Sequence, residues 1–239
     1  MNLLHDIPIT TDNFKNINCI IEVPKDTSTK YQYDDKLEMF ELTDCLVSSL
    51  KHPINYGFIP QTLTQGPEWF KREYPLDVLV FNHDAIDRGA LVKCRILGVL
   101  EFEDSGSIDN KILAVPSWSP PDKYSKIEDI EEAHLKIYKH FFRICKLAHS
   151  SNTQVAEWQS AKEALAVIEE SHQRWNFKRE HPCHDCTARL RHRNRSGHSH
   201  GHRRGRRHRH HTGADHRPRE SRRGLASGAV AAGRGDARG

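Results

Sequence analysis

The chain has 239 residues and a formal net charge of +4, and its charges are unevenly distributed. Residues 178–239 hold 17 of the 36 Lys and Arg and 10 of the 17 His with few acids, whereas residues 1–177 are net acidic. No apolar run approaches the length of a membrane span, and the start lacks the basic head and apolar run of a secretory signal, so we expect neither membrane insertion nor secretion.

The first half of the chain is rich in strand patterns. Residues 91–103 alternate between apolar and charged side chains, which is typical of a half-buried strand. Other segments are short apolar runs that end at a proline or a polar cluster. The predicted strands cover residues 17–23, 30–34, 76–82, 91–103 and 111–116. Residues 52–60 combine Pro, Asn and Gly with aromatic residues and are predicted to form a turn.

The period of the apolar residues changes after the last predicted strand. Residues 126–149 carry apolar side chains at helical spacing, and a second helical pattern runs from Trp158 to Trp175. Strands followed by helices predict an α+β domain, in which a small antiparallel barrel or sheet is buttressed by two C-terminal helices.

Composition divides the chain into two parts. Residues 1–177 have enough apolar content for one packed domain. The basic tail (residues 178–239) has almost none and is predicted to be disordered. Four cysteines, Cys19, Cys45, Cys94 and Cys145, are scattered through the body, which suits buried thiols in a reducing compartment and predicts a cytoplasmic protein.

Several acids and lysines lie near predicted strand ends. Oxygen ligands suit hard cations such as Mg²⁺, and lysines balance phosphate charge. Spacing alone favours the simpler interpretation, in which acids in turns and lysines at strand ends are solvated. The candidate side chains are Glu22, Asp77, Asp104, Asp109, Lys30, Lys111 and Lys146.

The order of short motifs along the chain changes that balance. The chain carries five short motifs in this order: Glu22-Val23-Pro24, Lys30-Tyr31, Asn55-Tyr56-Gly57-Phe58-Ile59, Pro75-Leu76-Asp77-Val78-Leu79-Val80 and Ala114-Val115-Pro116. Over roughly residues 15–177 this series resembles the soluble family I inorganic pyrophosphatases. The resemblance implies a twisted five-stranded β-barrel, similar to the OB-fold, with two packed helices.

The resemblance also implies an activity, hydrolysis of inorganic diphosphate by metal-assisted in-line attack of water with Mg²⁺ as cofactor. Carried over by position, the metal ligands are Asp77, Asp104 and Asp109, with Glu22 nearby. The side chains that hold phosphate oxygens are Lys30, Tyr56, Lys111 and Lys146. The catalytic residues that the resemblance implies are Asp77, Lys30, Tyr56 and Lys111. The resemblance also implies assembly into homo-oligomers.

The chain departs from the family at the water-activating signature. Where the family has Asp-Gly-Asp-Pro-x-Asp, the chain has Arg72-Glu73-Tyr74-Pro75-Leu76-Asp77, so an arginine and a tyrosine replace two carboxylates. Tyrosine with an ordinary pKa is a poor base at neutral pH. Glu73, or Glu68 in the preceding loop, is a candidate substitute metal ligand. Further family positions are changed at Gln32, His52 and Cys145, and an arginine expected near Asp44 is absent.

Three functions therefore stay open. A divergent diphosphate hydrolase is favoured, because most of the inferred metal and phosphate residues are present. A catalytically impaired relative that binds phosphate compounds or partners is the main alternative. The third is nucleic-acid binding through the arginines of the basic tail, whose Cys183 and Cys186 also suggest a weak zinc motif. A tail without function, from a frameshift or fusion, is favoured over a binding module.

Overall fold

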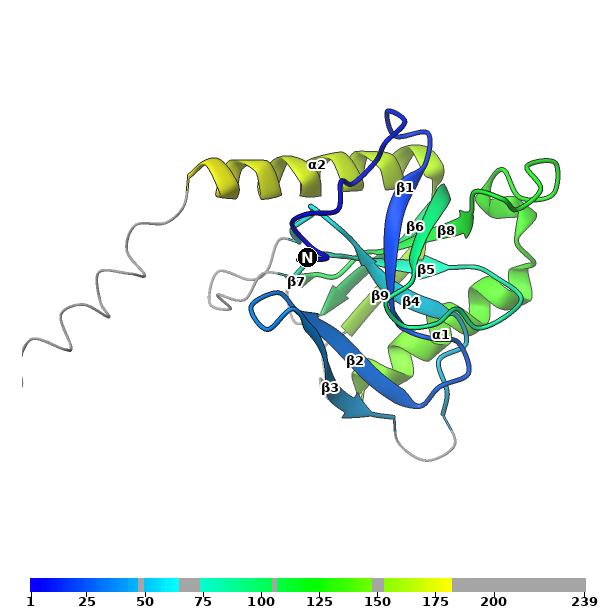
Figure 1. Cartoon of the computed structure of the whole chain (residues 1–239). Coiled ribbons are helices and arrows are strands. Elements are labelled where there is room, and N and C mark those ends of the chain that lie inside the picture. The colour runs from blue at the N-terminus through cyan, green and yellow to red at the C-terminus, as the bar shows by residue number, and fades with distance from the viewer. Residues whose placement is uncertain (47–49, 65–73, 105–106, 148–152, 182–239) are drawn as a thin grey trace, which may run out of the picture. The chain divides into compact units, whose positions relative to one another are not determined.

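A computed structural model describes residues 1–46, 50–64, 74–104, 107–147 and 153–181. Strands dominate the first two thirds of these residues, and two long helices follow (Figure 1). The strands are β1 (Ile17–Val23), β2 (Thr29–Asp34), β3 (Met39–Cys45), β4 (Asn55–Ile59), β5 (Leu76–Val80), β6 (Leu91–Asp104), β7 (Ser107–Ile108), β8 (Lys111–Pro116) and β9 (Thr153–Ser160). The helices are a 3₁₀ turn (Ile127–Asp129), α1 (Glu132–Leu147) and α2 (Ala161–Glu180).

Five of the strands close into a barrel. Pairing runs from β1 through β4, β5, β8 and β6, and β6 pairs again with β1. Strand β1 is buried along all of its length because it has a neighbour on each side and a core face within the barrel. The predicted five-stranded barrel is confirmed, but the antiparallel expectation was wrong at one pairing, since β5 and β8 are parallel. Strands β2 and β3 form a separate hairpin.

Two apolar clusters join the helices to the barrel. One contains Ala164 and Ile168 of α2 together with barrel residues such as Ile17 and Val78. The other contains Phe141 and Phe142 of α1 with further barrel residues. Each helix thus covers its own part of the barrel, as Figure 1 shows for α1 and α2.

The structure corrects three of the predicted elements. Residues 55–59 form strand β4 within the segment predicted to be a turn. Trp158 lies in strand β9 rather than in the second helix, which begins after the N-cap Ser160. The first helix begins at Glu132 rather than at 126, because the 3₁₀ turn precedes it. Local patterns missed the two strands because pairing of β4 with β5 and of β9 with β6 decides them.

Gly57 explains how a turn-like sequence becomes a central strand. A Cβ atom at this position would lie 1.9 Å from the carbonyl oxygen of Ile20 on β1, so any other residue would push the two strands apart. The residues on either side, Tyr56 and Phe58, are buried. The glycine therefore serves close packing of β4 on β1.

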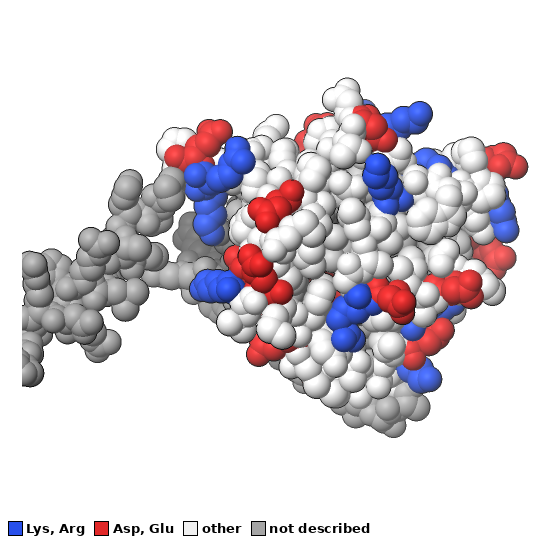
Figure 2. Space-filling model, viewed as in Figure 1, with Lys and Arg blue, Asp and Glu red and all other residues white. Residues whose placement is uncertain are grey.

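Helix α2 continues past the predicted domain boundary at residue 177 and ends at Glu180. The boundary stays a prediction, and residues 182–239 of the basic tail lie outside the described part of the chain. No helix in the described residues is long and apolar enough to cross a bilayer. Both signs of charge are interspersed on the face of the body that Figure 2 shows.

Candidate active site

The candidate site is built around Lys111, the first residue of β8. Parallel pairing sets Lys111 directly beside Asp77 of β5. The Lys111 ammonium donates hydrogen bonds to the carboxylates of Asp77 and Asp109, the latter at 2.5 Å. The Lys111 side chain is only 4% exposed, and those of Asp77 and Asp109 are 17% and 26% exposed. Two acids therefore converge on one buried positive charge.

Aromatic rings surround the Lys111 ammonium on its other sides. The nitrogen lies 6.0 Å from the ring centroid of Tyr56 and 5.8 Å from those of Phe102 and Phe142. These distances are near the outer limit for cation–π attraction. The rings exclude water, so the ion pairs with the carboxylates are stronger than at an open surface.

Tyr56 connects this cluster to the rest of the barrel. Its side chain hydrogen-bonds to Asp77, which lies diagonally across from it on β5. Burial, and then the negative charges of Asp77, Glu22 and Asp109, raise the pKa of Tyr56 well above its usual value. The hydroxyl therefore stays protonated at neutral pH and acts as a hydrogen-bond donor.

The charges of the cluster depend on one another. Burial raises the pKa of Asp77, while the Lys111 ammonium opposes this shift. Burial disfavours the charged form of Lys111, but the carboxylates of Asp109 and Asp77 outweigh it and raise the pKa of Lys111. Lys111 therefore stays protonated and positively charged throughout the physiological pH range.

Glu22 adds a second buried acid from β1. Its Oε1 accepts a hydrogen bond of 2.7 Å from the backbone N–H of Tyr33, and the residue is 6% exposed. Burial raises the pKa of Glu22 to about 8, because the hydrogen bond from Tyr33 offsets only part of the desolvation and the charge of Asp77 adds to it. The carboxyl is thus largely protonated at pH 7 in the metal-free protein.

This shift predicts a pH-dependent effect of Glu22→Gln in magnesium-free buffer. The raised pKa stabilises wild type fully below about pH 4.5, and this contribution is lost as pH rises through about 8. Glutamine does not titrate, so at pH 8 the free energy of unfolding of the variant should exceed that of wild type by about 4 kcal/mol, with almost no difference at pH 4.5. Urea unfolding at both pH values measures this. A constant difference, or none, would contradict the shift.

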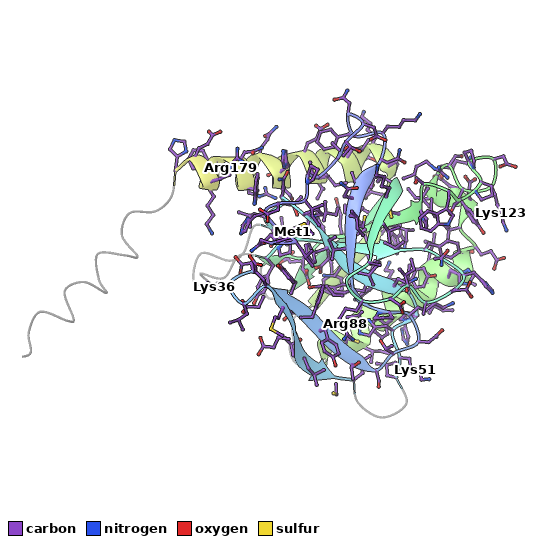
Figure 3. All side chains as sticks on the ribbon, in the orientation of Figure 1. Met1, Lys36, Lys51, Arg88, Lys123 and Arg179 are labelled. Atoms are coloured by element: carbon purple, nitrogen blue, oxygen red, sulfur yellow. The ribbon has the colours of Figure 1, made fainter. Side chains whose placement is uncertain are left out.

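The β2–β3 hairpin brings further charges toward Glu22. Lys30 acts on Glu22 and on His52 through its field. Arg88, from the segment after β5, donates from Nε to the carbonyl of Glu22 at 2.9 Å, and its guanidinium lies 3.2 Å over the ring of Tyr31. Figure 3 labels Arg88 beside the hairpin. By contacting Glu22 on β1 and Tyr31 on β2, Arg88 links the two strands.

His52 is the unusual side chain of this region. It is 4% exposed, and neither ring nitrogen has a hydrogen-bond partner among the described residues. Burial, and to a lesser extent the charge of Lys30, lower the pKa of His52 to about 4. The imidazole is therefore neutral at pH 7.

Part of the predicted site falls outside the described residues. This applies to the side chains of Asp104 and Lys146 and to Arg72, Glu73 and Glu68. Tyr74 is described, and its carbonyl accepts hydrogen bonds of 2.8 and 3.1 Å from the N–H and hydroxyl of Thr64. These hydrogen bonds thus hold the backbone just before β5 against Thr64.

The donor set suits a hard divalent cation in its chemistry. Asp77 and Asp109 offer carboxylate oxygens that already share one positive charge, that of Lys111. Within the part of the chain that the structure describes, no three His, Cys, Asp or Glu side chains are grouped closely enough to hold a metal ion. A magnesium site here would therefore draw on Asp104 or on rearrangement of Lys111.

The structure thus brings together Asp77, Asp109, Lys111 and Tyr56, and it places Glu22 within range of the charge of Asp77. Lys30 acts through its charge on Glu22. Sequence reasoning did not single out Phe102 and Phe142, whose apolar rings are typical of a core. It noted His52 only as a changed family position. The signal that identifies His52 is the burial of a ring whose nitrogens have no hydrogen-bond partner in the described part of the chain, which no sequence pattern reports.

Comparison with known proteins gives a consistent result. The family model described as inorganic pyrophosphatase matches residues 19–176. The chain is 36% identical over 170 residues to the inorganic pyrophosphatase of Nanoarchaeum equitans, covering 69% of this chain and 99% of that protein. It is 34% identical over 163 residues to that of Neisseria meningitidis serogroup B, covering 67% and 89%.

Solved structures agree with this similarity. An inorganic pyrophosphatase from Thermus thermophilus superposes with a TM-score of 0.65 at 28% identity, covering 74% of this chain and 99% of that one. One from Neisseria gonorrhoeae has a TM-score of 0.64 at 30% identity, covering 72% and 97%.

Proposed function

This chain belongs to the inorganic pyrophosphatase family, and we propose on that premise that it hydrolyses inorganic diphosphate to two phosphates, with magnesium as the cofactor. The observation that carries the proposal is the convergence of Asp77 and Asp109 on the Lys111 ammonium, beside the hydroxyl of Tyr56. Such a cluster offers both anionic and cationic groups to a charged substrate.

The acidic side of the cluster would hold the metal. Asp77 and Asp109, with Asp104 and Glu22, supply the oxygen ligands that magnesium prefers. A bound Mg²⁺ ion neutralises charge on the diphosphate and makes a neighbouring water molecule more acidic. Asp77 on β5 and Glu22 on β1 are held in place by the barrel, and Asp109 lies just before β8, in the connection from β7.

The basic side of the cluster would hold the substrate. Lys30, Lys111 and Lys146 supply ammonium groups for phosphate oxygens, and Tyr56 donates a hydrogen bond. Lys111 would then exchange its carboxylate partners for a phosphate oxygen. Each of these contacts strengthens as charge moves to the leaving phosphate, so the same residues favour the transition state.

The reaction needs one proton acceptor. Water attacks one phosphorus atom, the bond from that phosphorus to the bridging oxygen breaks, and the second phosphate leaves with the bridging oxygen. Asp77 is our candidate for the group that takes the water proton, because burial raises its pKa toward the working range. Tyr74, where the family has an aspartate, is too weak a base for this step.

Phosphate release from diphosphate tests the proposal directly. We expect the purified full chain to release phosphate with millimolar Mg²⁺ and not with a chelator. Asp77→Asn should lower kcat/KM by about 10²–10⁴-fold, because it removes a metal ligand and the proton acceptor. Asp122→Asn changes an exposed acid far along the chain and serves as the matched control. Equal activity of the two variants would contradict the role of Asp77.

A second candidate function is favoured by one observation, the replacement of two family carboxylates by Arg72 and Tyr74. Fewer carboxylates hold divalent ions less well, and an arginine repels them. The chain would then bind phosphate compounds or partners without turnover. Binding of diphosphate without release of phosphate at high protein concentration would support this function. Assembly into homo-oligomers and a cytoplasmic location stay predictions.

A further inference from the structure

We propose that His52 is a phosphate-binding residue that takes up a proton when an anion enters the site, so that tetrahedral dianions bind more tightly as pH falls. The inference rests on the proposed function, because it assigns a role within the same substrate site. It concerns a residue that replaces the tyrosine expected from the family resemblance.

The first support is the burial of an unsatisfied imidazole. Both ring nitrogens of His52 are shielded from solvent and have no partner among the described residues. Buried polar groups in proteins are nearly always hydrogen-bonded, so such an atom indicates a missing ligand. The backbone cannot move to relieve it, because His52 donates to Thr27 at 2.9 Å and accepts from Asp26 at 2.8 Å.

The second support is the position of the ring. Its centroid lies 6.1 Å from that of Tyr56 and 4.9 Å from that of Phe141. Tyr56 reaches Asp77 on one side, and the field of Lys30 reaches His52 on the other. Of the residues assigned to phosphate oxygens, Tyr56 thus contacts His52 and Lys30 acts on it through its charge, so an anion held by these two residues is expected to reach the imidazole.

The charges around His52 explain the proton uptake. Lys30 from β2 is the charged group that acts on the ring, Tyr56 from β4 stays neutral, and Phe141 from α1 carries no charge. Burial and Lys30 lower the pKa of His52 to about 4 in the empty site. A bound dianion pairs with Lys30 and attracts the imidazolium, which raises the pKa again. The proton comes from solvent.

Histidine and tyrosine differ in this respect. A tyrosine at this position would donate one hydrogen bond but would not titrate between pH 5 and 8, whereas histidine changes charge in that range. Linkage then requires the anion affinity to rise by up to about tenfold per pH unit on acidification, below the pKa of His52 in the complex.

Sulfate is the probe of choice, because it is a tetrahedral dianion that does not itself titrate in this range. We would measure sulfate binding to the full chain by calorimetry from pH 5.5 to 7.5, in two buffers of different ionisation enthalpy. Wild type should take up roughly half a proton or more per bound sulfate at pH 6 through this site. His52→Gln should lose that uptake, and His52→Tyr should lose it while keeping a donor.

The comparison between variants isolates one histidine. The other histidines and the arginines of the basic tail are the same in wild type and variant, so the difference removes their sulfate binding. His83→Gln changes an exposed histidine and is the matched control, which should keep the uptake. NMR titration of the His52 ring in wild type, with and without sulfate, needs no substitution and covers the case in which a variant does not fold.

The outcomes separate the inference from the proposed function. Uptake that survives His52→Gln, a His52 pKa unmoved by sulfate, or absence of sulfate binding to wild type would each overturn the inference. Hydrolysis of diphosphate without proton-linked binding would overturn the inference alone. Proton-linked sulfate binding without hydrolysis would leave the inference in place and count against the hydrolase.

Discussion

Lys111→Met is expected to lower the free energy of unfolding by about 3 kcal/mol in magnesium-free buffer at pH 7, since removing one member of a buried ion cluster leaves its partners uncompensated. Without the ammonium, the carboxylates of Asp77 and Asp109 face each other beside aromatic rings. Methionine keeps much of the side-chain volume, so the loss reports charge rather than a cavity. Urea unfolding measures it.

The pH dependence identifies the cause of this loss. In the variant, mutual repulsion raises the pKa of the two carboxyls above their unfolded values. Their contribution is therefore complete below about pH 4 and lost as pH rises through the raised values, so the deficit should shrink on acidification. Lys136→Met removes an exposed lysine that pairs with Glu132 and should cost less than about 1 kcal/mol. Equal losses for the two lysines would contradict the ion cluster.

Magnesium should act on the same variant. A divalent cation that binds only the folded state raises the free energy of unfolding, and the increase grows with the ratio of the cation concentration to its dissociation constant. Since Lys111 no longer competes for Asp77 and Asp109, we expect millimolar Mg²⁺ to raise the melting temperature more in Lys111→Met than in wild type. An identical magnesium effect would place the metal away from these carboxylates.

The double substitution Arg72→Asp, Tyr74→Asp is expected to raise kcat/KM for diphosphate by about 10²–10⁴-fold, the usual contribution of one well-placed general base. The resemblance to the family implies that these positions carry a metal ligand and the residue that activates water. The new carboxylates would add negative charge where the arginine now repels cations. Steady-state phosphate release with Mg²⁺ measures the gain.

Two further variants make this experiment selective. Tyr74→Asn removes the phenol without supplying a base, and it should leave the rate nearly unchanged. Arg72→Asp alone should lower the magnesium concentration needed for half-maximal rate, with a smaller effect on kcat. If the double variant is no faster than wild type, then Asp77 alone already supplies the full base catalysis, or the natural substrate is not diphosphate.

Strands with a clear apolar pattern were predictable because their pattern is local. Residues 17–23 form β1, and residues 111–116 form β8, at the predicted limits. Strand β9 was not predictable in this way, because Trp158 fits a helical period as well as a strand and only pairing with Leu100 on β6 decides between them. The hairpin partner β3 is mostly exposed and has no buried residue, so it lacks the buried face that a strand pattern reports.

The candidate site was predictable as a set of residue types and not as an arrangement. Glu22, Asp77 and Asp109 were selected as acids near strand ends, and Lys111 was assigned to phosphate. In the structure Lys111 pairs with Asp77 and Asp109, and its assignment to phosphate stays a prediction. The contact with Asp77 depends on the parallel register of β5 and β8, which joins residues 34 positions apart in the chain.

The amino-acid sequence alone determined which chemical groups the protein has, including the two carboxylates it lacks at positions 72 and 74, and which segments can bury an apolar face. The tertiary structure alone decided which charges meet and which are shielded from water. Closure of the barrel sets the neighbours of Lys111, and packing against Phe141 of α1 and Tyr56 of β4 buries the His52 ring, whose nitrogens have no hydrogen-bond partner among the described residues. Pairing and burial depend on residues distant in the chain, so no local pattern contains them.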